Sequence, residues 1–176
     1  MGCNVQVVLL CEDRQQEAFL RRFLTQTGKS MRMQRVERSP KGRGAGEQFV
    51  RAQFAKEVAF YRSRAHRVEQ ALVVMIDADK KPVGARAAEL AATLTEPLRT
   101  SHRVAVFSPG RNIETWIAYL DGQTVNESDE YPRLDRQSDC QQHVDALVAM
   151  CRENRLRQPS PPSLDAACVE YRSRLA

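Results

Sequence analysis

The sequence predicts an α/β fold in which helices flank a mostly parallel four-stranded sheet, with a helical appendage at the C-terminal end. Two apolar runs, Val7–Cys11 and Leu72–Ile76, have the composition of strands that are buried on both faces, as in a parallel sheet. Strand-like and helix-like segments alternate along the chain in the order βαβαβαβα. This alternation is typical of parallel strands that are joined by crossover helices.

The first two strand–helix pairs extend to about residue 66. Asp13 and Gln16 have the spacing of a helix capping box, and Gly28 is a helix stop signal. A basic, Gly-rich loop at 39–46 separates the second strand from a long helix. The expected elements are a strand at 4–11, a helix at 13–27, a strand at 31–36 and a helix at 47–66.

The next two pairs complete the sheet. Pro82 suits the first turn of a helix, and Ser108–Gly110 form a turn before another helix. The expected elements are a strand at 72–76, a helix from Pro82 that buries Val83, Ala87, Leu90, Leu94 and Leu98, a strand at 104–107, and a helix that buries Ile113, Trp116, Ile117 and Leu120.

The character of the chain changes after Asp121, which divides it into an α/β domain at 1–121 and an acidic loop with C-terminal helices at 122–176. Residues 122–138 are polar and without period, so we expect a surface loop. A helix with Cys151 on its buried face is expected at 139–155. A Pro-rich break follows, and then a last short helix that Ser163 caps.

Composition bounds the class of protein. The 176 residues are 42% hydrophobic, which is enough for one core. No apolar run approaches the roughly 20 residues of a membrane span, and the N-terminal residues do not form a secretory signal. We therefore expect no membrane partner and a cytoplasmic location. The five cysteines are odd in number and scattered, which indicates reduced thiols and not a disulfide framework.

Basic residues are concentrated in the first half of the chain. Between Arg14 and Arg67 there are 14 Lys and Arg residues against four Glu residues, a net charge of +10. The whole chain carries +5, so the remainder carries −5. A basic half suits a polyanionic substrate such as nucleic acid, although any single Arg fits a solvated helix face equally well.

Carboxylates follow both apolar runs where each strand should end. Glu12 follows the first run, and Asp77 and Asp79 follow the second. The carboxyl ends of parallel strands meet at the sheet edge where α/β proteins bind ligands. Residues two apart in an extended chain point to the same side, so we expect the three carboxylates to converge. Oxygen ligands of this kind suit a hard divalent cation.

The segments Cys11-Glu12-Asp13-Arg-Gln-Gln-Glu17 and Met75-Ile-Asp77-Ala-Asp79 resemble the two motifs of the TOPRIM fold. This Rossmann-like fold is shared by topoisomerases, DnaG-type primases and nucleases of the overcoming-lysogenization-defect (OLD) type. Glu12 matches the glutamate after the first strand, and Asp77 and Asp79 match the Asp-x-Asp pair. The resemblance covers about residues 4–120. Asp13 departs from it by replacing the usual Gly, and Glu17 is only the acid nearest to a second one that OLD-type nucleases carry.

The resemblance implies metal-dependent cleavage of phosphodiester bonds in DNA or RNA. Glu12, Asp77 and Asp79 would bind Mg²⁺ or Mn²⁺, and Glu17 or Glu114 would complete a second site. Lys80 would neutralise the leaving oxygen. The expected contacts to the nucleic-acid backbone are Lys41, Arg43, Arg51, Lys56 and Arg111. Many nucleases of this fold act beside an ATPase in phage defence. Because this chain has no Walker A sequence, that ATPase would be a separate partner protein.

Other interpretations of these residues stay open on the sequence alone. Glu12 can cap a helix, Asp77 and Asp79 can be turn residues, and Glu114 suits the first turn of a helix because of the helix dipole. Lys80 fits an exposed loop better than a role at a leaving oxygen. As a whole, the chain fits a non-catalytic TOPRIM-like subunit that binds nucleic acid or a partner protein, or a flavodoxin-like phosphotransfer module.

Overall fold

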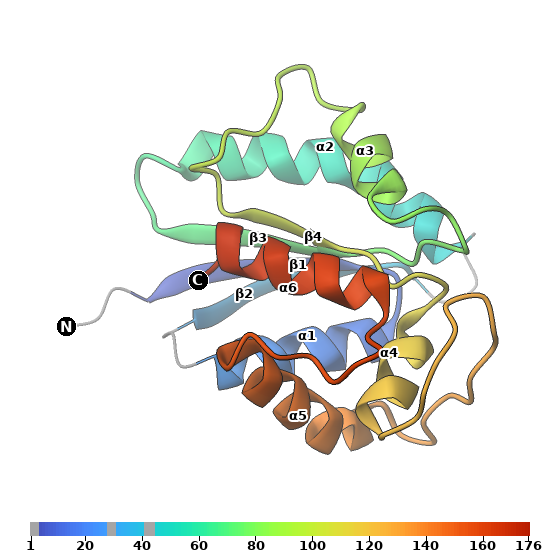
Figure 1. Ribbon diagram of the computed structural model, residues 1–176. Coiled ribbons are helices and arrows are strands. Elements are labelled where there is room, and N and C mark those ends of the chain that lie inside the picture. Colours follow the sequence, from blue (N-terminus) through green and yellow to red (C-terminus); the bar gives the residue numbers. More distant parts are fainter. Residues whose placement is uncertain (1–3, 28–30, 41–44) are drawn as a thin grey trace.

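The computed structural model describes residues 4–27, 31–40 and 45–176. Its centre is a four-stranded sheet in the order β2-β1-β3-β4, in which every neighbouring pair is parallel (Figure 1). The strands are β1 (Val5–Cys11), β2 (Met31–Arg38), β3 (Gln70–Met75) and β4 (Val104–Phe107). The expected α/β class and four-stranded parallel sheet are confirmed.

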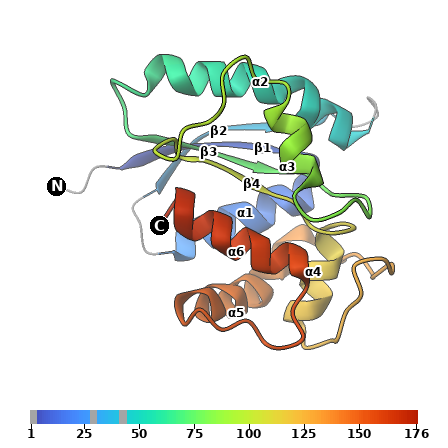
Figure 2. The same ribbon diagram turned by 45° about the horizontal axis from the view of Figure 1, so that its top comes forward.

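Helices cover both faces of this sheet. In the described residues they are α1 (Arg14–Gln26), α2 (Gly46–Arg64), α3 (Ala85–Ala91), α4 (Ile113–Leu120), α5 (Gln141–Arg152) and α6 (Pro162–Arg174), with a 3₁₀ turn η1 (Gln137–Cys140) before α5. Helices α2 and α3 lie on one face, and α1, α5 and α6 lie on the other (Figure 1, Figure 2).

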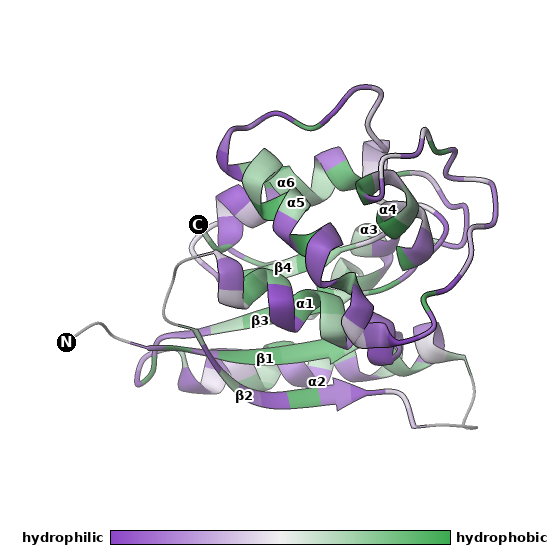
Figure 3. Cartoon of the chain, turned by 90° about the horizontal axis from the view of Figure 1, so that it is seen from below, coloured by the Kyte–Doolittle hydropathy of each residue, from purple (hydrophilic) through white to green (hydrophobic). Residues whose placement is uncertain are grey.

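Alternate residues of β1 belong to two different hydrophobic clusters, one on each face of the sheet. Val7 and Leu9 pack with α1, α4, α5 and α6, whereas Val8 and Leu10 pack with α2 and α3. This division follows from the two-residue period of a strand. Figure 3 shows how composition follows burial: β1, which is covered on both faces, is hydrophobic except near its start, while the edge strand β2 is largely hydrophilic. Both expected buried strands are therefore central in the sheet.

The residues after 121 belong to the main core. Val144 of α5, Leu164 of α6 and Leu175 are buried in the same cluster as α1. Helix α6 also lies against β4, where the backbone N of Val106 donates to Oε1 of Glu170 at 3.2 Å. The loop between α4 and η1 lies beyond the carboxyl ends of the strands (Figure 1, Figure 2). The loop therefore lies at the edge of the sheet where Glu12 and Asp77 follow their strands.

One predicted helix starts later than expected. Pro82 precedes α3 instead of starting it. Gly84 lies between them with φ of 85°, a left-handed conformation that glycine adopts without steric cost and that a helix cannot contain. Val83 is therefore 50% exposed instead of buried. Leu94 and Leu98 do pack on the core, but from the irregular segment after α3.

The predicted capping role of Ser163 is also wrong. The N-cap of α6 is Pro161, and Ser163 lies inside the first turn. Its buried hydroxyl accepts hydrogen bonds from the backbone N of Gly110 at 3.0 Å and from Nε1 of Trp116 at 2.8 Å. It also contacts the carboxylate of Glu127 in the loop after α4. Ser163 thus joins α6, α4 and that loop.

The other boundaries differ by a few residues. The second strand continues to Arg38, and the helix expected at 139–155 is η1 followed by α5, which ends at Arg152. The expected stop at Gly28 lies outside the described residues. In 4–27, 31–40 and 45–176, no helix has the length and apolar character needed to cross a membrane.

Candidate functional site

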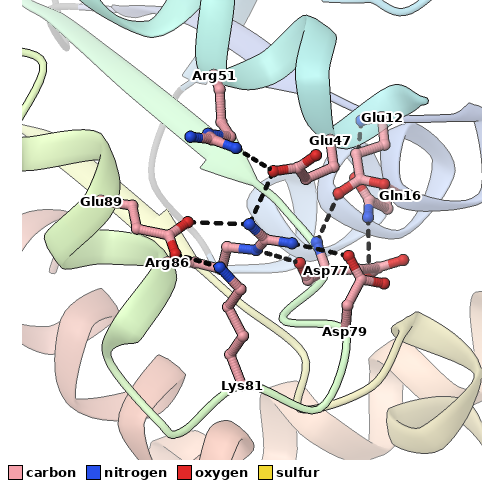
Figure 4. A network of polar contacts seen from close by, with 9 residues as sticks. All are labelled: Glu12, Gln16, Glu47, Arg51, Asp77, Asp79, Lys81, Arg86 and Glu89. Carbon is pink, nitrogen blue, oxygen red and sulfur yellow. Dashed lines mark hydrogen bonds and ion pairs between the residues drawn. The ribbon is translucent and has the colours of Figure 1, made fainter. Parts of the chain in front are cut away.

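Glu12 and Asp77 meet at the carboxyl ends of two adjacent strands. Strands β1 and β3 are parallel neighbours in continuous register up to the pair Leu10–Val74, so the residues that follow them arrive at the same edge. Oε1 of Glu12 accepts a hydrogen bond from the backbone N of Asp77 at 2.7 Å (Figure 4). The first acidic motif therefore holds the backbone of the second.

Gln16 connects the same two motifs through its side chain. Helix α1 begins after Asp13, whose Oδ1 accepts from the backbone N of Gln16 at 2.9 Å, as the capping box predicts. The Gln16 amide does not return to Asp13. Its Oε1 accepts from the backbone N of Glu12 at 2.9 Å, and its Nε2 donates to Oδ1 of Asp77 at 2.9 Å. Gln16 is fully buried, so these bonds fix the position of both acids.

Asp79 departs from the path that the sequence predicts. The chain is not extended there, because φ is 49° at Asp79 and 67° at Lys80. The Asp79 side chain is 62% exposed, and its Oδ2 accepts from Nη2 of Arg86 at 2.8 Å. The extended backbone that the sequence predicts for this segment therefore does not continue through Asp79. The charge of Asp79 still acts on Glu12, whose pKa it raises.

Arg86 is the centre of a polar network that the sequence did not predict (Figure 4). It lies on α3 and is only 4% exposed. Besides Asp79, its guanidinium donates to Glu47 at 2.7 Å, to Glu89 at 2.9 Å and to the backbone O of Asp77 at 3.1 Å. Arg86 thus supplies a buried positive charge where several carboxylates come together.

A cleft of about 610 Å³ opens beside Glu12. Its lining includes three acids and three arginines, beside neutral residues. The acids are Glu12, Asp13 and Glu114, and the arginines are Arg14, Arg38 and Arg133. Arg133 comes from the loop after α4, so the acidic surface loop expected at 122–138 also forms a wall of the cleft. The cleft combines a negative patch with the guanidinium groups that favour phosphate.

Close packing of α2 fixes one side of this cleft. Gly46, the first residue of α2, lies directly against Glu12. A Cβ atom at Gly46 would be 2.6 Å from Cβ of Glu12, a distance that real side chains do not tolerate. Glycine is therefore required there by a close approach of the helix to the acidic motif.

Burial and mutual repulsion raise the pKa values of the central acids. Burial is the largest cause for Glu12, whose pKa rises to about 7; the backbone hydrogen bond from Asp77 lowers it, and the charges of Asp79, Asp13 and Glu47 raise it further. The pKa of Asp77 is raised well above its usual value, by burial first and then by the charges of Glu12, Asp13 and Glu114. Crowded carboxylates of this kind favour a proton or a cation.

Glu114 faces the same site from the first turn of α4. It is 5% exposed, and burial is the main cause that raises its pKa. Its Oε1 lies 3.5 Å from Nε of Arg133, whose side chain is 85% exposed. A favourable interaction with the helix dipole does not by itself explain why Glu114 is buried beside the cleft. Glu114 is instead an acid with a raised pKa that lines the cleft beside the two motifs.

The other predicted residues lie away from this centre or make different contacts. Glu17 forms ion pairs with Arg21 and Arg38. Lys80 is exposed in the left-handed turn. The predicted nucleic-acid contacts are dispersed: Arg51 pairs with Glu47 at 3.0 Å, Lys56 is exposed on α2, Arg111 donates to the backbone O of Ser128 at 3.0 Å, and Lys41 and Arg43 lie outside the described residues.

Comparisons with protein-family models, with curated proteins and with solved structures found no match for this chain.

The acidic residues of the site meet the requirements of a divalent cation only in part. Within the described ranges, no group of three or more His, Cys, Asp or Glu residues is arranged to hold a metal ion. One reason for this is that the Asp79 carboxylate is already hydrogen-bonded to Arg86. Mg²⁺ usually needs only one or two carboxylates, with waters and substrate phosphate as its remaining ligands. Glu12 and Asp77 fit that smaller requirement, since they are adjacent oxygen donors with raised pKa values.

Proposed function

We propose that this protein is a divalent-metal-dependent nuclease that cleaves phosphodiester bonds of DNA or RNA in the cleft beside Glu12. The observation that carries the proposal is the hydrogen bond of 2.7 Å from the backbone N of Asp77 to Glu12. It unites two acidic motifs that are 65 positions apart at the edge of a parallel sheet. This is the edge at which α/β folds bind their ligands.

In this proposal Glu12 and Asp77 hold the cation, Mg²⁺ or Mn²⁺, and Gln16 holds both acids in place. A bound cation of this kind lowers the pKa of a coordinated water and stabilises negative charge on phosphate. The Asp79 carboxylate forms an ion pair with Arg86, so Asp79 would bind the cation only if that ion pair opened. Glu17, which is engaged by two arginines, is a weaker candidate for a second site than Glu114.

Glu114 is the residue best placed to move a proton. Its raised pKa favours the protonated form, and it lines the cleft with Glu12. A buried carboxyl group of this type can donate a proton to a leaving oxygen or accept one from water. We assign this role to Glu114 and not to Lys80, whose side chain is exposed outside the cleft.

The arginines of the cleft would hold the phosphate backbone. Arg14 is exposed and has no ion pair with another described residue, so its guanidinium is open to a ligand. Arg133 extends from the loop on the other wall. These residues and Arg38 replace the set that the sequence suggested, because they lie beside the acids. Arg–phosphate contacts position a nucleic acid without reading its sequence.

The TOPRIM-like motifs extend the proposal to a partner. A nuclease of this kind would act beside a separate ATPase, as a subunit of a phage-defence complex. This part rests on the motif resemblance around Glu12 and Asp77 alone.

One observation favours a second candidate function, a non-catalytic subunit that binds nucleic acid or a partner protein. Arg86 pairs with Asp79, Glu47 and Glu89, while Arg51 also pairs with Glu47 and Lys81 with Glu89, so three basic side chains balance three acids. A network that is balanced by basic side chains can be purely structural. In that case the cleft would bind phosphate through its arginines without cleaving it.

A cleavage assay separates the two candidates. Purified protein, alone and with its ATPase partner, is incubated with double-stranded DNA, single-stranded DNA and RNA in Mg²⁺ or Mn²⁺. Asp77→Asn should lower cleavage by orders of magnitude. Asp145→Asn is the matched control, because Asp145 is a half-exposed acid of α5 whose ion pair among the described residues is with Arg22. Binding that persists in every preparation without cleavage would overturn the nuclease proposal in favour of the non-catalytic subunit.

A further inference from the structure

Two cysteines that are far from the acidic site lie in direct contact. Cys151 is near the end of α5 and Cys168 is in the middle of α6, and both are free thiols. Their sulfur atoms are 2.6 Å apart, although the residues are 17 positions apart in the sequence. Two elements that the Pro-rich segment separates thus place a pair of thiols side by side.

The pair is accessible from outside. Both cysteines line a surface cleft of about 460 Å³ whose walls include Arg155 and Arg172. Cys168 is 6% exposed and Cys151 is more open. The pKa of Cys151 is lowered, first by its hydrogen bond with Cys168 and also by the charge of Arg172. A thiol in an electropositive, partly open position is the type that reacts as a thiolate.

The other described cysteines lack these properties. Burial is the main cause that raises the pKa of Cys11 to about 12, and burial also raises the pKa of Cys140. Both are almost completely buried. They are inert core thiols, so among the described cysteines the contrast singles out Cys151 as the reactive thiol. The pKa of Cys168 is raised, first by its hydrogen bond with Cys151, so Cys168 is the second thiol of the pair and not the first to react.

We propose that Cys151 and Cys168 are a modification site, a dithiol that a low-molecular-weight disulfide such as oxidised glutathione converts into an intramolecular disulfide joining α5 to α6. The Cys151 thiolate attacks one sulfur of the small disulfide, whose S–S bond breaks and releases one small thiol. The Cys168 sulfur then attacks the mixed disulfide, forms the bond to Cys151 and expels the second small thiol. The two protein thiols lose two electrons and two protons, which the small disulfide receives.

The disulfide would link α5 to α6, the two helices that pack with α1 on one face of the sheet. Helix α5 and helix α6 contribute Val148 and Leu164 to the same buried cluster as α1 and β1. A disulfide that closes a loop of this length restricts the unfolded chain, so the oxidised protein should melt higher by roughly 6–12 °C. This inference does not depend on the proposed nuclease activity.

The test uses the full chain in buffers of increasing oxidised-to-reduced glutathione ratio, followed by denaturation and alkylation. Wild type should lose two of its five alkylatable thiols. Digestion with trypsin should give a cross-linked pair of peptides, 137–152 and 158–172. Cys140 shares the first of these peptides with Cys151, so Cys140→Ser is the matched control and should retain the cross-link.

Two variants report the separate steps. In Cys168→Ala the glutathione adduct on Cys151 should persist, because the attacking sulfur is absent, and the rise in melting temperature should vanish. In Cys151→Ser neither adduct nor cross-link should form on Cys168. Full alkylation of Cys151 and Cys168 in folded wild type at the most oxidising ratio would overturn the proposal, as would a cross-link that survives in Cys151→Ser.

Discussion

Nε2 of Gln16 donates a hydrogen bond of 2.9 Å to Oδ1 of Asp77, across 61 positions of sequence. The same side chain accepts from the backbone N of Glu12 at 2.9 Å. One neutral amide therefore lies between the two acidic motifs. It accepts a hydrogen bond from the backbone of Glu12 and donates one to the carboxylate of Asp77. This relationship makes the geometry of the acids dependent on a residue that carries no charge.

Replacing Gln16 with Ala should destabilise the fold. The change leaves the backbone N of Glu12 and an oxygen of Asp77 without their partners in a buried place, which costs about 1–3 kcal/mol. Urea unfolding of the metal-free protein measures the loss. Gln123→Ala is the control, because Gln123 is exposed and should change stability by less than about 0.5 kcal/mol. Equal stability of the two variants would show that the Gln16 bonds contribute nothing net.

Stability without metal should fall as pH rises through neutrality. The pKa of Glu12 is about 7 in the folded protein against 4.5 for the free group, and that of Asp77 is also raised. Because the folded state holds these protons more tightly, the favourable contribution is complete below about pH 4 and is lost as pH rises through 7. For Glu12 alone the loss between pH 5 and 8 is about 2–3 kcal/mol.

The measurement is urea unfolding in EDTA at several pH values between 5 and 8. The double variant Glu12→Gln/Asp77→Asn removes both titrations and serves as the reference, since its other groups titrate as in wild type. The difference in unfolding free energy between the two proteins should change across this range. A constant difference would mean that the two acids titrate as they do in the unfolded chain.

Replacing Arg86 with Met should have two opposite effects. It leaves Glu47, Glu89 and Asp79 without their shared partner, so stability in EDTA should fall by about 2–4 kcal/mol. It also frees the Asp79 carboxylate, so Mg²⁺ should raise the melting temperature of the variant more than that of wild type. Arg51→Met is the control: it removes an exposed pair with the same Glu47 and should cost about 0–1 kcal/mol. The prediction fails if Mg²⁺ shifts both proteins equally.

Nucleic-acid binding should depend on the arginines of the cleft. Changing Arg14, Arg38 and Arg133 to Gln should reduce the slope of log affinity against log salt by about 0.7–0.9 for each phosphate that the protein no longer neutralises. The measurement is fluorescence anisotropy of a labelled oligonucleotide in EDTA at several salt concentrations. The comparison protein carries Gln at Arg51, Lys56 and Arg111, the sites that the sequence suggested. A larger effect in the comparison protein would place the binding surface elsewhere.

The sequence predicts the backbone of the site better than its side-chain partners. The strands could be predicted because β1 and β3 are continuous apolar runs, and parallel pairing then brings Glu12 and Asp77 to one edge. The left-handed turn at Asp79 has no clear signal, because the residues concerned are Asp and Lys and not Gly. The sequence therefore predicts the wrong path for Asp79.

The contacts of Arg86 and Arg133 depend on how helices and loops cross, which a periodic pattern does not specify. In the sequence Arg86 resembles any charged residue of an amphipathic helix, yet it is buried because α3 lies over the end of β3 and near Glu47. Arg133 belongs to a loop whose composition indicates only exposure. The contact of Cys151 with Cys168 is of the same kind, since it follows from the packing of two helices on one core.

Binding of Mn²⁺, followed by the loss of the electron paramagnetic resonance signal of the free ion at pH 7.5, tests most directly whether Glu12 and Asp77 hold a cation. Wild type and the control Asp145→Asn should bind Mn²⁺ at a site from which Mg²⁺ displaces it. Glu12→Gln and Asp77→Asn should each weaken this binding by about tenfold or more, because each removes a charged oxygen ligand. Mn²⁺ affinities that are the same in wild type and in both site variants would contradict the assignment of a metal to these two residues.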